Sequence, residues 1–116
     1  MARRRVVVTG LGIISPVGIG IPDAWGSIVA GKSGISRISR FDASTFPSQI
    51  AGEVKGFDVA KWLPPKEARR FDTFIHYGLA ASIDAIKDSG LDLEKEEDRK
   101  STRLNSSHLG ISYAVF

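Results

Sequence analysis

Residues 71–86 have the sequence FDTFIHYGLAASIDAI, and this stretch gives the clearest structural signal in the chain. Its apolar and small residues recur every three or four positions, which is the period of an α-helix. Asp72 suits the start of such a helix as a cap, Lys87 suits its last turn, and Gly90 suits its end. We therefore predict a long amphipathic helix whose stripe consists of Phe71, Phe74, Ile75, Gly78, Leu79, Ser82, Ile83 and Ile86.

The first residues of the chain carry strand and turn signals. Residues 5–9 contain three consecutive valines, which predicts a buried strand. Gly10 and Gly12 follow directly, and we interpret them as the site of a bend or bulge. Residues 15–18 have the sequence SPVG, which is the composition of a turn.

The middle of the chain is predicted to contain shorter elements. A helix begins near Pro22 and ends at Gly31, with an apolar face made of Ala24, Trp25, Ile28 and Val29. Residues 32–40 are expected to form a loop, and residues 49–54 a short strand. Residues 66–70 are expected to form a short turn of helix after the pair Pro64-Pro65.

Composition indicates one small globular domain and excludes several classes of site. The chain has 116 residues, of which 42% are hydrophobic and 25% charged, so wholesale disorder is not expected. It has no cysteine, which excludes disulfides, thiolate zinc sites and a cysteine nucleophile. No apolar run approaches the length of a membrane span, and no signal peptide is evident, so we expect a cytoplasmic protein without membrane contact.

Motifs for cofactor, metal or hydrolase chemistry are incomplete. Gly10 and Gly12 lack the third glycine and the following helix of a dinucleotide fingerprint, so no cofactor is expected. His76 and His108 have no second ligand at metal-binding spacing, so no metal site is expected. The serines before His108 form no nucleophile elbow, and no catalytic residue is assigned.

Basic residues gather in two places along the chain, which carries a formal net charge of +3. Residues 3–5 are three arginines before the first strand, and we interpret them as a solvated end. Lys66, Arg69 and Arg70 have the spacing i, i+3 and i+4, which places side chains on one face of a helix. From spacing alone they are either a solvated face beside Glu67 or a docking patch for an anion or acidic protein. Nucleic-acid binding is not expected, because aromatic stacking platforms and groove-reading motifs are missing.

Four successive segments resemble β-ketoacyl-acyl-carrier-protein synthases, most strongly the bacterial synthase II type. The resemblance covers residues 3–99, and its segments are RRVVVTGLGIISPVG, AWGSIVAGKSGIS, RFDASTFPSQIAGEVKGFD and RRFDTFIHYGLAASIDAIKDSGL. It implies an α/β, thiolase-like condensing-enzyme fold, of which this chain supplies only the opening part of the first half. It also implies that the complete parent enzyme is a homodimer.

The resemblance implies fatty acyl elongation by decarboxylative Claisen condensation with malonyl-acyl-carrier-protein. In the family a cysteine takes the acyl group and two histidines assist decarboxylation, and all three follow the part that this sequence matches. A basic patch at the start of the long helix docks the acidic acyl carrier protein in the family. Lys66, Arg69 and Arg70 match those positions, which favours the docking interpretation.

The end of the chain departs from the family pattern. Residues 100–116 replace the expected glycine-rich strand with a segment similar to a spurious translated end, so we predict a family-derived part at 1–99 and a non-family tail at 100–116. The leading hypothesis is an N-terminal fragment of a synthase that is inactive alone. The alternative is a non-catalytic module that docks acyl carrier protein.

Overall fold

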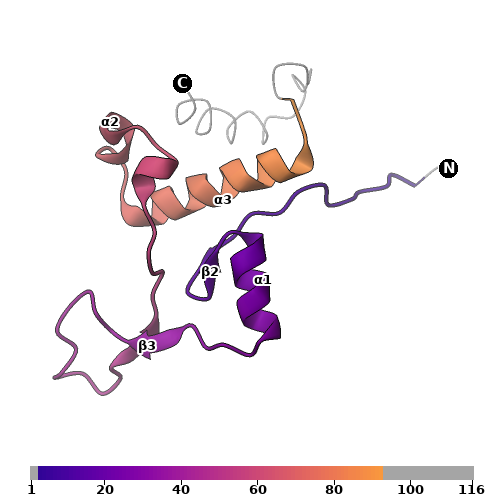
Figure 1. The fold of residues 1–116 in the computed structure, drawn as a ribbon. Helices are drawn as coiled ribbons and strands as arrows, with labels where there is room; N and C mark the ends of the chain where they lie inside the picture. Colours follow the sequence, from indigo (N-terminus) through magenta and orange to yellow (C-terminus); the bar gives the residue numbers. More distant parts are fainter. Residues whose placement is uncertain (1–2, 93–116) are drawn as a thin grey trace.

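The computed structural model describes residues 3–92, which form two short β-hairpins, several short helices and one long helix (Figure 1). The predicted boundary at residues 99 and 100, the tail and His108 lie outside the described residues. Within the described range, no helix has the length and apolarity needed to cross a membrane. The elements in chain order are β1 (Ile14–Ser15), β2 (Gly18–Ile19), α1 (Ile21–Val29), β3 (Ile35–Arg37), β4 (Ile50–Gly52), a 3-10 turn (Val59–Lys61), α2 (Pro65–Ala68) and α3 (Thr73–Ser89).

The long helix α3 confirms the main prediction from the sequence. The Asp72 carboxylate accepts a hydrogen bond from the Thr73 backbone N–H at 2.7 Å, and Gly90 ends the helix in the left-handed conformation with φ of 70°. The predicted stripe is only partly buried. Ile83 is buried, but Phe74 is 71% exposed, whereas Ala80, outside the stripe, is fully buried. The periodicity therefore predicted where the helix lies in the sequence. It did not predict which side of the helix is buried against the rest of residues 3–92.

The predicted strand at residues 5–9 is wrong for this structure. The segment is extended but belongs to no ladder, and Val6, Val7 and Val8 are exposed. A strand is held by backbone hydrogen bonds to a neighbour, and the described residues offer this segment no pairing partner. Within residues 3–92 the three valines therefore form an extended, exposed segment and not the buried strand that their sequence predicts.

Gly10 and Gly12 serve close packing rather than a bend in the backbone. Neither has a positive φ, and a Cβ atom on Gly12 would lie 1.9 Å from the carbonyl oxygen of Ala81 in α3. A Cβ on Gly10 would lie 2.1 Å from the carbonyl oxygen of Ala85. The Leu11 backbone N–H donates to the Asp88 carboxylate at 2.9 Å, which fixes the segment against α3. The absence of two side chains thus lets the first segment contact the helix backbone.

Two antiparallel hairpins form the described β-structure. The predicted turn at residues 15–18 joins β1 to β2, and the Ser15 hydroxyl donates to the Gly18 carbonyl at 2.9 Å. The predicted strand at 49–54 is confirmed as β4. It pairs with β3, which lies in the stretch 32–40 where a loop was expected. The short, mixed sequence of β3 carries no alternating pattern, so pairing rather than local preference makes it a strand.

The buried core is small. Helix α1 starts and ends close to its predicted limits, but of its apolar face only Ala24 is buried, while Trp25, Ile28 and Val29 are exposed. The central contact joins Leu63 to Ile83, and Val59, Trp62, Ala68, Leu79 and Ile86 pack around it. This cluster holds the 3-10 turn and α2 beside α3.

Candidate functional site

The candidate site is the short helix α2, which lies beside the first turns of α3 (Figure 1). It begins at Pro65, where the missing N–H of proline costs no helical hydrogen bond. The Ala68 N–H donates to the Pro64 carbonyl at 2.9 Å and the Arg69 N–H to the Pro65 carbonyl at 3.2 Å. Arg69 keeps helical backbone angles as the C-terminal cap, so the turn continues to the second arginine. The predicted short turn before α3 is thereby confirmed.

Three cationic side chains project from this turn into solvent. Lys66, Arg69 and Arg70 are all exposed. Arg70 lies 3.6 Å from the Glu67 carboxylate, yet 65% of its side chain remains accessible, so this ion pair neutralises it only partly. Within residues 3–92, Lys66 and Arg69 have no ion-pair partner. We call these three residues the basic patch, and its positive charge is available to an acidic partner.

His76 connects the basic patch to the long helix. Its Nε2 atom lies 2.8 Å from the carbonyl oxygen of Ala68, the last residue of α2, and the ring is half-buried. The structure gives this histidine a specific partner eight residues earlier in the chain. A carbonyl oxygen only accepts hydrogen bonds, so Nε2 carries the proton in this contact.

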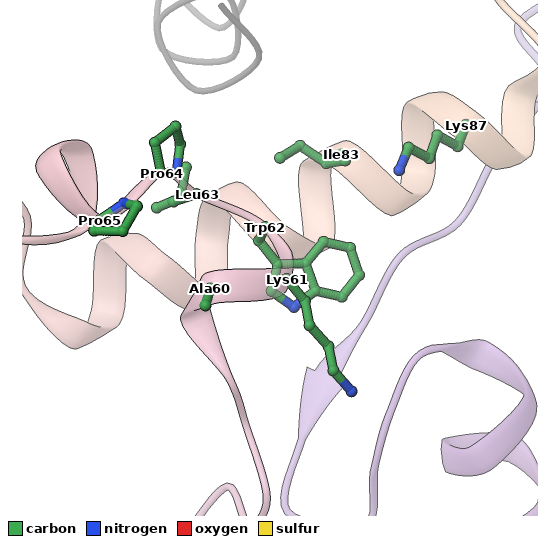
Figure 2. A pocket seen from close by; sticks show the side chains of 8 residues that line it. All are labelled: Ala60, Lys61, Trp62, Leu63, Pro64, Pro65, Ile83 and Lys87. Atoms are coloured by element: carbon green, nitrogen blue, oxygen red, sulfur yellow. The ribbon is translucent and has the colours of Figure 1, made fainter.

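A pocket of about 460 Å³ is lined by the 3-10 turn, by the Pro64-Pro65 pair and by α3 (Figure 2). Leu63 and Ile83 contribute apolar surface, and Lys87 extends back along α3 toward Ile83 (Figure 2). The other lining residues are Ala60, Lys61, Trp62, Pro64 and Pro65. No local pattern predicts this pocket, because its walls come from segments about twenty residues apart in the sequence.

A second set of contacts links residues that follow β3 and β4 in the chain to Tyr77 of α3. The Arg40 guanidinium donates to the Tyr77 hydroxyl at 2.6 Å, which raises the arginine pKa above its ordinary value. Tyr77 packs edge-on against Phe57 with ring centroids 5.0 Å apart. The Ser39 hydroxyl donates to the Glu53 carboxylate at 2.7 Å and holds the pKa of that carboxyl below its usual value. Of these contacts, the Arg40 hydrogen bond and the Phe57 ring contact reach α3, one residue after His76.

Comparison with known proteins defines the class of protein. The family model for the beta-ketoacyl synthase N-terminal domain matches residues 3–114, and the chain therefore belongs to the β-ketoacyl synthase family. The structure is similar to that of the ishigamide ketosynthase/chain length factor, with a TM-score of 0.70 and 36% sequence identity over 80% of this chain and 23% of that chain. This similarity confirms the predicted thiolase-like α/β fold, present here as an opening part.

Proteins with similar sequences include several that are named 3-oxoacyl-[acyl-carrier-protein] synthase 2. The protein of that name from Vibrio cholerae is 44% identical over 112 residues, covering 97% of this chain and 25% of the relative. The corresponding proteins from Synechocystis and Vibrio harveyi are 40% identical over 111 residues and 48% identical over 96 residues. The chain spans about a quarter of the length of these relatives. Together with the match to the N-terminal domain of the family, this confirms that it corresponds to the N-terminal part of a synthase.

Proposed function

We propose that this chain is the opening part of a 3-oxoacyl-acyl-carrier-protein synthase that elongates fatty acyl chains by decarboxylative condensation with malonyl-acyl-carrier-protein. Its own contribution is to bind the acidic carrier protein through the basic patch of Lys66, Arg69 and Arg70. Membership of the β-ketoacyl synthase family supports the reaction class. The observation that carries the docking role is the exposure of three neighbouring cations with one partial counter-charge among the described residues.

The electrostatic contribution of this patch is moderate and depends on salt. Each exposed ion pair contributes about 0.2–1 kcal/mol, so three pairs contribute on the order of 1–3 kcal/mol. That range corresponds to roughly a five- to hundredfold change in affinity. Since the charges are exposed, salt at about 0.5 M screens most of the gain. The patch therefore favours encounter and orientation of an acidic protein more than very tight binding.

The condensation itself needs groups that this chain does not carry. A thiolate is the nucleophile that takes an acyl group as a thioester, and the sequence contains no cysteine. The family resemblance assigns the catalytic cysteine and two histidines to the part that follows. Residues 3–92 thus contribute binding and positioning to the complete enzyme, whose homodimeric state and cytoplasmic location remain predictions.

The experiment compares two acyl donors in the full-length synthase. Substitution of Lys66, Arg69 and Arg70 by alanine should raise the apparent KM for carrier-bound substrate about five- to hundredfold. Self-acylation from a small thioester needs no carrier protein and serves as the internal reference. An equal loss with both donors would show that the patch only supports the fold, and the docking proposal would fail.

A further inference from the structure

The basic patch belongs to a helix that is too short to be stable without contacts to the rest of the molecule. Helix α2 has four residues, whereas isolated helices need about 12–15 residues to be even marginally stable in water. Its orientation is therefore set by contacts with the rest of the molecule. Two such contacts involve Ala68: its side chain packs on the Leu63 and Ile83 cluster, and its carbonyl accepts the His76 hydrogen bond at 2.8 Å.

The carbonyl of Ala68 is one of the groups that the end of a helix leaves without an intrahelical partner. The His76 ring supplies a partner from the first turns of α3, where the backbone is fixed by the Asp72 cap. The peptide that His76 holds joins Ala68 to Arg69, and Arg70 follows one residue later. The hydrogen bond thus acts at the point that determines where these two guanidinium groups project.

We infer that His76 is a positioning residue for carrier-protein docking: its Nε2–H bond to the Ala68 carbonyl fixes the end of α2 and presents Arg69 and Arg70 to the acidic partner. This inference rests on the proposed docking function of the basic patch. His76 itself makes no contact with the carrier protein in this account. Its effect on affinity passes entirely through the two arginines.

The test uses the full-length synthase and a fluorescently labelled acyl carrier protein, with the dissociation constant measured by anisotropy at low salt. His76→Phe keeps a ring of similar size and removes the donor, and it should weaken binding about two- to tenfold, the range for one lost hydrogen bond. His76→Gln keeps an N–H donor of similar reach and should bind within about twofold of the parent protein. Ser82→Ala, which changes an exposed hydroxyl on the same helix, is the control.

A double-mutant cycle separates positioning from general stability. In an Arg69→Ala/Arg70→Ala background, His76→Phe should cause no further loss, because interacting sites are not additive. Equal losses in both backgrounds, or no loss in either, would overturn the inference. If His76→Phe does not fold, His76→Gln provides the test. A loss of affinity in His76→Gln as large as that of the double arginine variant would also overturn the inference. If removal of the arginines leaves binding unchanged, the docking proposal itself fails, whereas an effect of the arginines without an effect of His76 refutes only the role of His76.

Discussion

Gly12→Ala should disrupt the contact between the first segment of the chain and α3. A Cβ atom at this position would lie 1.9 Å from the Ala81 carbonyl oxygen and 2.8 Å from the Ala85 backbone nitrogen. Real Cβ atoms essentially never approach another heavy atom closer than 3.0 Å, so the segment and the helix must separate by about 1 Å. Both obstructing atoms are backbone, and neither can rotate away as a side chain would.

The expected cost is at the upper end of the range for overpacking, about 3 kcal/mol, because the helix must move as a unit. The matched control is Gly26→Ala in α1, where nothing lies within 4 Å of the added Cβ. There alanine should stabilise the helix by about 0.5–1 kcal/mol. Thermal unfolding of the full-length synthase should show a lower midpoint for Gly12→Ala and an unchanged or higher midpoint for Gly26→Ala. Equal midpoints for the two variants would refute the close-packing explanation.

Three further predictions concern the chain itself. The 116-residue chain should form no acyl-enzyme when it is incubated with acyl donors, because it has no thiol; intact-mass spectrometry that shows a thioester adduct would contradict this. The isolated chain should melt with low cooperativity and self-associate, since apolar residues such as Val6 and Trp25 are exposed. A sharp melt of a monodisperse monomer, seen by circular dichroism and light scattering, would instead favour the alternative of an independent docking module. Ser39→Ala should raise the pKa of Glu53 toward the ordinary value of a glutamate, because the Ser39 hydroxyl bond stabilises the carboxylate. The stabilisation from this bond is fully present above the ordinary pKa of a glutamate and is lost as the pH falls through the lower folded pKa. NMR titration of the carboxyl carbon should show the shift in Ser39→Ala and not in Ser48→Ala.

Local signals in the sequence predicted the helical part of the fold. The period of α3, its Asp72 cap and its Gly90 end all depend on residues close together in the sequence. None of these features needs a partner from a distant part of the chain. The strand at residues 5–9 failed for the opposite reason, because a strand depends on a neighbour that local sequence does not specify. The packing role of Gly10 and Gly12 was also missed, since it depends on helix residues about seventy positions later.

Part of the candidate site could likewise be predicted from nearby residues, and part of it could not. The spacing of Lys66, Arg69 and Arg70 and the turn that carries them follow from nearby residues, and the structure shows all three exposed. Their role as a docking surface stays a prediction. The bond from His76 to Ala68 was not predictable, because a lone histidine on a helix gives no sign of which carbonyl it meets.

Direct binding of acyl carrier protein to the full-length synthase tests the central claim. Alanine at Lys66, Arg69 and Arg70 should weaken binding about five- to hundredfold at low salt, and the difference from the parent protein should nearly vanish at about 0.5 M salt. The control replaces the exposed arginines at residues 3–5 by alanine, which removes the same charge elsewhere and should change affinity less than about twofold. Equal weakening by the two triple variants, or no weakening by the first, would contradict docking at the basic patch.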